Sequence, residues 1–173
     1  MDSRMAKLNT EEQRLALYYF EITDLWKRFC EQHSILFDLT CDEYSLLLAS
    51  ELEELEEKVK EKEAVIRTIQ QLEIVRKEII ENLNNDYPNE SIDSVNGLLN
   101  FMAKYEIEKK EKHLFRFNAL LIDIIEKIQA QNKRNQLFIN KALLSLKQIR
   151  MDALGKKNYS VYTAKGSAVD KST

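Results

Sequence analysis

Strong helix breakers are almost absent from this chain, and their scarcity limits the folds that it can adopt. Its 173 residues include one proline, Pro88, and three glycines, Gly97, Gly155 and Gly166. In a helix interior, glycine and proline are disfavoured relative to alanine by about 1 and about 3 kcal/mol. The composition therefore favours an all-α protein. Long helices of this kind suit an elongated antiparallel helical bundle, or a coiled-coil hairpin, of three to four helices.

Apolar residues recur at steps of three and four in the first half of the chain, which predicts two long amphipathic helices. The first begins at a capping box formed by Thr10 and Gln13, and a break is predicted within residues 32–45. The second covers about residues 41–84 and begins at another capping box, Thr40 to Glu43. The predicted seams are Leu15, Tyr18, Ile22, Leu25 and Phe29, widened by Tyr19 and Trp26, and then Leu48, Leu52, Leu55, Val59, Lys62, Ile66, Ile69, Leu72, Val75, Ile79 and Leu83.

Two further helices are predicted after an asparagine-rich segment around Pro88. Ser91 is the predicted cap of a short helix over about residues 92–103. A long last helix follows over about residues 104–154, and Gly155 is expected to end it as a C′ glycine. Its predicted seam is Leu114, Phe117, Leu121, Ile124, Ile128, Asn135, Phe138, Ala142, Leu146 and Ile149.

Charge is distributed unevenly along the chain, whose net charge is −3. Residues 156–173 contain four lysines and one aspartate, so this segment carries +3 and residues 1–155 carry −6. We therefore predict an elongated helical bundle over residues 1–155 and a flexible, basic C-terminal tail over residues 156–173. The acidic balance of the whole molecule argues against nucleic acid as a partner.

Targeting and membrane signals are not recognisable in the sequence. The first residues, MDSRMAKLNTEEQR, lack the apolar core of a signal peptide. The longest uncharged run, SVNGLLNFMA, has ten residues, whereas a membrane-spanning helix needs about 20. The two cysteines, Cys30 and Cys41, do not make a disulfide framework. We expect a cytoplasmic protein that does not insert into a membrane.

Catalytic and metal-binding motifs are not found either. The two histidines, His33 and His113, are eighty residues apart. A di-iron helical bundle requires Glu-x-x-His, but Cys30 and Lys110 stand three residues before these histidines. Cys30 and His33 alone do not complete a four-ligand zinc site, and no glycine-rich phosphate loop is present. We expect a protein that is not an enzyme and that uses no metal or other cofactor.

The most informative polar residues interrupt the seam of the last predicted helix. Gln131, Asn132 and Asn135 stand where apolar residues are expected, and burying an unpaired amide costs about 1–3 kcal/mol. An apolar stripe then resumes and widens. One interpretation is an ordinary core in which an asparagine sets the register; the other is a groove for a partner's amphipathic helix. The stripe consists of Phe138, Ile139, Ala142, Leu143, Leu146 and Ile149.

The C-terminal segment carries two tyrosines, Tyr159 and Tyr162, among its lysines. A segment that is disordered alone can fold around a partner, and aromatic side chains concentrate interface energy. One hypothesis is therefore that the tail is a binding arm. The alternative is a frayed terminus with no function, since chain ends are commonly poorly ordered.

Four stretches of the sequence, in this order, resemble the FlgN family of flagellar export chaperones. They are the first helix with its Leu/Trp seam, ELEELEEKVKEKEAVIRTIQQLEIVRKEI, NKRNQLFINKALLSLKQI with its Asn-x-x-Asn pattern, and the YTAKG of the tail. Together they cover roughly residues 12–166. The positions that match the family's binding segment are Asn132, Asn135, Phe138, Leu143, Leu146, Ile149, Tyr162 and Gly166.

The resemblance implies a function in flagellar type III export. Proteins of this kind bind the terminal helices of the two hook–filament junction proteins (FlgK-like and FlgL-like) and prevent their premature assembly. They deliver these clients to the export gate (FlhA-like). The alternative hypothesis is a generic coiled-coil scaffold or adaptor that self-associates. A homo-oligomer in the absence of a client is compatible with both.

Overall fold

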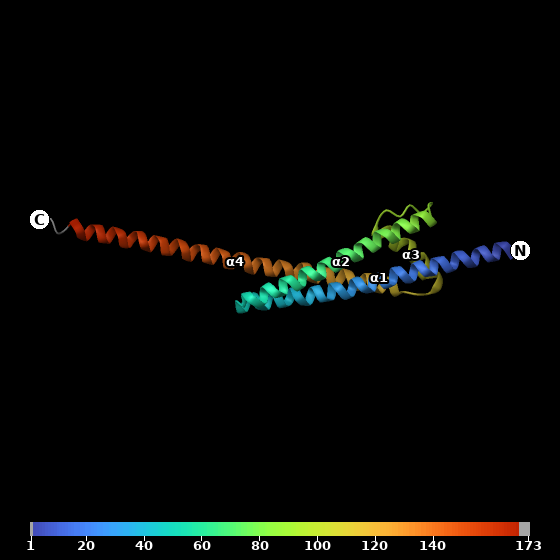
Figure 1. The fold of residues 1–173 in the computed structure, drawn as a ribbon, viewed down its shortest axis with the longest axis horizontal. Helices are drawn as coiled ribbons and strands as arrows, with labels where there is room; N and C mark the ends of the chain where they lie inside the picture. The colour runs from blue at the N-terminus through green and yellow to red at the C-terminus, as the bar shows by residue number, and fades with distance from the viewer. Residues whose placement is uncertain (1, 170–173) are drawn as a thin grey trace. The chain divides into compact units, whose positions relative to one another are not determined.

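The computed structural model describes the backbone of residues 2–169 and the side chains of residues 10–155. Within the described backbone every regular element is helical, and the helices number four (Figure 1): α1 (Asp2–Ala49), α2 (Leu52–Asp86), α3 (Val95–Lys109) and α4 (His113–Val169). This confirms the prediction of an all-α helical bundle.

The chain divides into two compact units, Met1–Gln131 and Asn132–Thr173. Unit 1 contains α1, α2, α3 and the first part of α4, and unit 2 contains the remainder of α4. The boundary predicted between residues 155 and 156 separates a folded body from a tail, which is a different division, and it stays a prediction.

α1 is longer than the sequence pattern indicated, at both of its ends. Thr10 lies inside the helix, so the capping box predicted there is wrong. The break predicted within residues 32–45 is also wrong, because α1 continues to Ala49. Thr40 does not cap a helix: its hydroxyl donates to the Leu36 carbonyl at 2.6 Å, one turn earlier, and the residue is fully buried. No glycine or proline interrupts this stretch, so packing of Leu39 and Thr40 keeps it helical.

The turn between α1 and α2 consists of Ser50 and Glu51. Ser50 has a φ of 59°, in the left-handed region, which disfavours residues that carry a Cβ. Its amide donates to the Leu47 carbonyl, and the Glu51 amide donates to the Leu46 carbonyl, so both backbone amides of the turn are hydrogen-bonded. The backbone hydrogen bonds therefore end the long helix here without a glycine.

We expect Ser50→Gly to raise the free energy of unfolding by about 0.5–1 kcal/mol, because glycine adopts positive φ without steric cost. Urea unfolding followed by circular dichroism measures the change. Ser45→Gly, inside α1, is the matched control and should lower stability by about 0.5 kcal/mol, because glycine is a poorer helix former than serine. Equal destabilisation by both substitutions would contradict the strain assigned to Ser50.

The chain between α2 and α3 is held by side chains rather than by regular structure. Both amide atoms of Asn84 pair with the backbone of Ile92, at 2.7 and 2.8 Å. Ser94, and not the predicted Ser91, caps α3 by accepting from the Gly97 amide at 3.1 Å. Buried Ile92 fixes the segment against the core and shifts the helix start by three residues.

The junction between the last two helices also differs from the prediction. α3 continues past residue 103 to Lys109, and Lys110 closes it in the left-handed conformation with a φ of 57°. α4 then begins at His113 and continues through Gly155 to Val169, so the prediction that Gly155 ends the last helix is wrong. A lone glycine weakens a helix without having to stop it.

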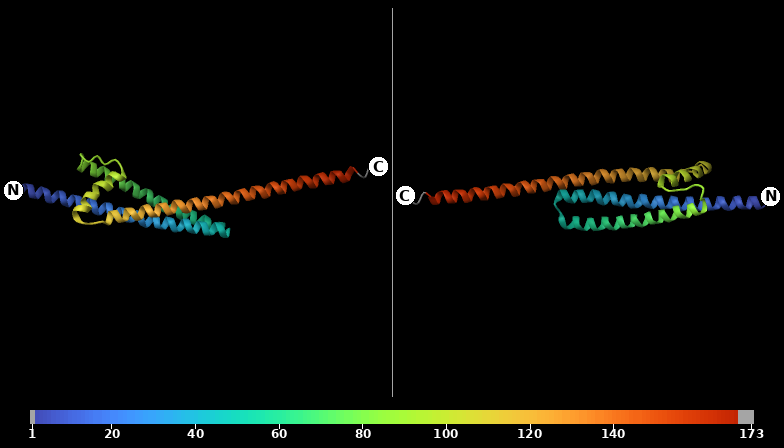
Figure 2. Two further views of the ribbon diagram at one scale, coloured as in Figure 1. Left: turned by 180° about the vertical axis from the view of Figure 1, so that it is seen from behind. Right: turned by 90° about the horizontal axis from the view of Figure 1, so that it is seen from above.

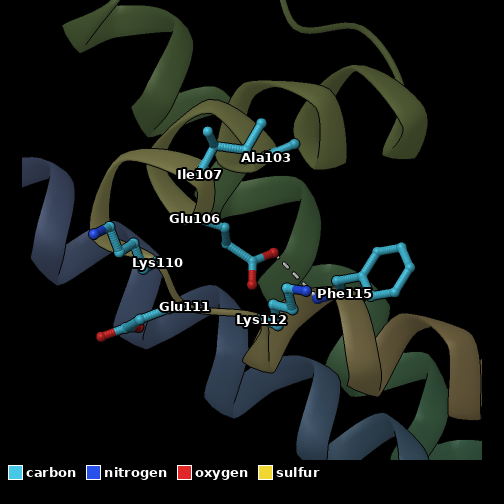
Figure 3. Close-up of a pocket in the computed structure, with 7 residues that line it drawn as sticks. All are labelled: Ala103, Glu106, Ile107, Lys110, Glu111, Lys112 and Phe115. Carbon is cyan, nitrogen blue, oxygen red and sulfur yellow. Dashed lines mark hydrogen bonds between the residues drawn. The ribbon is translucent and has the colours of Figure 1, made fainter.

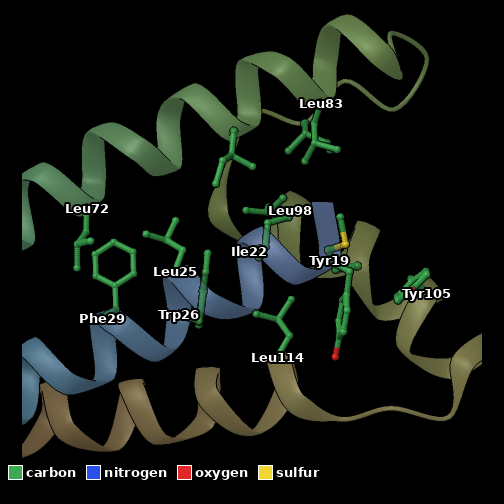
Figure 4. Close-up of a cluster of buried hydrophobic side chains, with 13 residues drawn as sticks. Tyr19, Ile22, Leu25, Trp26, Phe29, Leu72, Leu83, Leu98, Tyr105 and Leu114 are labelled. Carbon is green, nitrogen blue, oxygen red and sulfur yellow. The ribbon is translucent and has the colours of Figure 1, made fainter. Parts of the chain in front are cut away.

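The core of unit 1 forms around one face of α1 (Figure 4). Ile22, Leu25 and Phe29 are buried as the seam predicts, and Tyr19 and Trp26 widen it. The other helices contribute Leu72, Ile79 and Leu83 from α2, Leu98, Met102 and Tyr105 from α3, and Leu114 from α4.

A smaller cluster joins α1 to the first part of α4. Cys30, Ile124 and Ile128 are its buried members, and the Cys30 thiol donates to the Phe117 carbonyl at 3.2 Å. Burial raises the pKa of this thiol. Within unit 1, α1 therefore lies between α2 and the first part of α4 (Figure 2).

The predicted seam of α2 is confirmed only in its second half. Leu72, Ile79 and Leu83 are buried, whereas Leu52, Val59 and Ile66 are exposed. In the first half, α2 contacts α1 through ionic groups: the Lys62 ammonium lies 2.9 Å from the Glu43 carboxylate, and both side chains are less than one-fifth exposed.

Candidate partner-binding site

A buried carboxylate organises the corner where α3 meets α4. Glu106 is 7% exposed and accepts two hydrogen bonds, from the Tyr19 hydroxyl at 3.2 Å and from the Phe115 amide at 3.1 Å. The Phe115 amide belongs to the first turn of α4, so Glu106 satisfies one of the donors that a helix start leaves free. Burial and then the charge of Glu106 raise the pKa of Tyr19. One side chain thus joins α1, α3 and α4.

A cavity of about 530 Å³ opens beside this carboxylate (Figure 3). Ile107 and Phe115 lie on it and are 79% and 69% exposed, with Lys110 and Lys112 nearby. Because Glu106 is already engaged by two donors within the protein, it stabilises the corner and is not free to bind a ligand.

Glu106→Ala should lower the free energy of unfolding by about 2–3 kcal/mol, because it leaves the Tyr19 hydroxyl and the Phe115 amide without their acceptor. Glu106→Gln keeps one acceptor oxygen and should cost less. Chemical denaturation measures both, with exposed Glu108→Ala as the matched control. A cost for Glu106→Ala no greater than that for Glu108→Ala would show that these hydrogen bonds contribute nothing.

The largest uncovered apolar surface among the predicted site residues lies on α4 in unit 2. Every residue from 140 to 155 is exposed. Leu143, Leu146 and Ile149 are 59%, 63% and 64% exposed, although they occupy one face of the helix, at the three- and four-residue spacing of a packing seam. We call this face the α4 stripe; its members are Phe138, Ile139, Ala142, Leu143, Leu146, Ile149 and Ala153.

The predicted site residues differ in their surroundings. Asn132 is exposed and Asn135 is buried, at 3%. Phe138 and Ile139 are half-buried, and the exposed leucines follow them along the helix. The side chains of Tyr159 and Tyr162, and the surroundings of Gly166, lie outside the described residues. The role of all these positions in binding stays a prediction.

Other exposed apolar residues on the same helix are not part of the predicted site. Leu137, Leu144 and Met151 are each more than half exposed. At about 100° per residue they lie on the side of α4 away from the α4 stripe. A seam with one residue per turn does not include this second row, although the apolar character of its residues is visible in the sequence.

The described part of unit 2 and unit 1 carry net charges of opposite sign. Residues 132–155 contain five basic residues and one acidic residue, for a net charge of +4, whereas residues 1–131 carry −10. Lys147 and Arg150 lie beside the α4 stripe and are exposed. A partner for this surface should therefore present apolar and acidic groups together.

Within the part of the chain that the structure describes, no group of three or more histidine, cysteine, aspartate and glutamate side chains is placed to hold a metal ion. No helix within residues 2–169 offers an apolar window long enough to cross a membrane.

An all-helical chain with an uncovered apolar helix face is typical of proteins that bind other helices. Comparison with family sequence models identifies which family of such proteins this chain belongs to. Residues 18–170 match the family described as FlgN protein. The chain therefore belongs to the FlgN family, which is a family of flagellar export chaperones. No curated protein and no solved structure matched the chain.

Proposed function

We propose that this chain is a cytoplasmic chaperone for the two hook–filament junction proteins. In this proposal the α4 stripe binds the amphipathic terminal helices of FlgK-like and FlgL-like clients. The bound helices cannot assemble prematurely, and the complex is delivered to the FlhA-like component of the export gate. The protein performs no catalysis in this role.

The exposed α4 stripe is the observation that supports this proposal most directly. Leu143, Leu146 and Ile149 expose about three-fifths of their surface. Burying apolar surface stabilises a complex by roughly 25 cal/mol per Å². A client helix that covered these residues would therefore gain binding free energy by removing their side chains from water. An amphipathic helix presents apolar residues at the same spacing and is therefore a suitable partner.

Light scattering after size-exclusion chromatography tests the proposal. The full chain is measured alone and with a peptide copy of a junction protein's terminal helix. We expect a complex of defined stoichiometry. No complex at tens of micromolar peptide, together with an unchanged homo-oligomer, would contradict the proposal and favour the coiled-coil scaffold.

Residues 156–173 are proposed to assist binding, with Tyr159, Tyr162 and Gly166 as the positions that contact the client or the export gate. Removing them should leave the helical signal of the rest of the chain unchanged and weaken client or gate binding by about tenfold, since one aromatic anchor contributes 1–2 kcal/mol or more. Titration calorimetry measures the affinity. Equal affinity for the truncated and full chains would assign this segment no role.

A further inference from the structure

A second apolar stripe is partly exposed on the first half of α2. Leu52, Val59 and Ile66 are 71%, 39% and 38% exposed and are spaced seven residues apart. Residues seven apart drift by only about 20° around a helix, so the three share one face. We call them the α2 stripe. None of them belongs to either hydrophobic cluster of unit 1.

The α2 stripe has an acidic border. Residues 51–63 contain seven glutamates and three lysines. Each lysine is ion-paired within its own chain: Lys58 with Asp42 and Glu61, Lys60 with Glu56, and Lys62 with Glu43. Among the described residues, Glu53, Glu57 and Glu63 form no ion pair. Glu56 and Glu63 are exposed and lie next to the stripe, because they stand one turn before and after Val59.

The α4 stripe matches this surface in length and has the opposite charge. Leu52 to Ile66 covers fifteen residues and Phe138 to Ala153 covers sixteen, which correspond to about 21 and about 22 Å of helix. Lys147 and Arg150 border the α4 stripe, and no ion pair among the described residues involves either of them. Both stripes therefore have apolar centres, and their borders carry complementary charge.

We propose that the α2 stripe of one copy packs against the α4 stripe of a second copy. Each copy carries both surfaces, so a two-fold dimer contains the contact twice and leaves neither stripe exposed. If the α4 stripe also binds clients, which rests on the function proposed above, then the dimer covers the client-binding surface. A client must therefore displace the α2 helix of the second copy. The acidic helix then acts as an internal competitor for the client site.

Charge reversal in the full chain tests the pairing. One variant carries Glu56→Lys and Glu63→Lys, and the other carries Lys147→Glu and Arg150→Glu. All four positions are exposed, so circular dichroism should show intact helices in both. Sedimentation equilibrium should show a wild-type dimer that weakens with added salt, since exposed charges are screened beyond about 10 Å at 0.1 M. Each variant alone should dissociate about tenfold more readily, because reversal replaces attraction by repulsion at several exposed pairs.

An equimolar mixture of the two variants provides the decisive measurement. Its dimer should be tighter than that of either variant alone, because both contacts of the mixed dimer join opposite charges, whereas both contacts of each variant's own dimer join like charges. A monomeric wild type at about 100 μM, in the range where weak helix pairs are detectable, would overturn the proposal. A dimer insensitive to both reversals, or a mixture no tighter than its components, would also overturn it.

The same variants separate this proposal from the chaperone function. The Glu56→Lys and Glu63→Lys variant keeps the α4 stripe intact, so it should bind the client peptide at least as tightly as the wild type. Failure to bind the peptide, with the mixed dimer confirmed, would count against the chaperone function alone. Peptide binding by a wild type that stays monomeric would count against the dimer alone.

Discussion

Trp26→Ala should lower the free energy of unfolding by about 3–5 kcal/mol. Trp26 is 2% exposed at the centre of the unit 1 core, and its indole N–H donates to Asn118 on α4 at 3.1 Å. The substitution removes the largest fully buried side chain and leaves the Asn118 amide without this partner. Urea unfolding followed by far-ultraviolet circular dichroism measures the loss, because the variant has no tryptophan fluorescence.

Phe20→Ala is the matched control for this substitution. Phe20 lies on the same helix, six residues earlier, and is 69% exposed. Its truncation should change stability by no more than about 0.5 kcal/mol. If both variants lost similar amounts of unfolding free energy, Trp26 would contribute no more than an exposed aromatic residue, and its role as an anchor between α1 and α4 would be wrong.

Leu146→Asp should weaken the binding of a client helix by about 30-fold or more, because it places a charge at the centre of the α4 stripe. Truncating a central interface residue commonly costs 2 kcal/mol or more, and a buried unpaired carboxylate adds a desolvation penalty. Titration calorimetry with the terminal-helix peptide measures the affinity. Leu146 is 63% exposed in the free chain, so the helical signal and the unfolding midpoint should change little.

Leu144→Asp provides a control two residues away. Leu144 is 67% exposed and lies on the opposite side of α4, so its replacement should leave client affinity within about threefold, as for a residue outside an interface. Equal losses from both substitutions would mean that binding does not distinguish the two faces. Unfolding of the protein by Leu146→Asp would instead place Leu146 in a core and contradict its assignment to a binding surface.

Position in the seam did not predict exposure along the helices. Leu72 and Leu52 were both assigned to the predicted seam of α2, yet Leu72 is buried and Leu52 is mostly exposed. The same holds for Leu114 and Leu146 in α4. Periodicity reports which residues share a face, but only the path of the neighbouring helices decides whether that face is covered.

Helix ends were the least predictable features, and each error has a local physical reason. Capping patterns at Thr10 and Thr40 lie inside α1, because a side chain that is able to cap a helix also tolerates its interior when packing favours continuation. The actual ends fall at Ser50 and Lys110, which adopt positive φ without being glycine. Their sequences contain no signal for this conformation, which the tertiary contacts on both sides impose.

The buried polar contacts were equally invisible in the sequence. Glu106 stands among charged residues near the end of α3 and resembles a solvated side chain, but the fold brings Tyr19 to it from α1, 87 residues away, and Phe115 from the first turn of the next helix. Lys62 was included as a charged member of the predicted α2 seam, and the structure adds its partner, Glu43. A charge within an apolar pattern indicates an interaction without identifying the partner.

The sequence by itself determined that the chain is helical, where its apolar faces lie, how its charge divides between the ends, and that it resembles the FlgN family. These properties depend on local propensity and on period, which neighbouring residues specify directly. Only the tertiary structure decided where α1 ends, that Glu106 joins three helices, and that the α2 and α4 stripes are left partly exposed. Those features depend on contacts between different helices, and a local sequence pattern does not predict the free energy of such contacts.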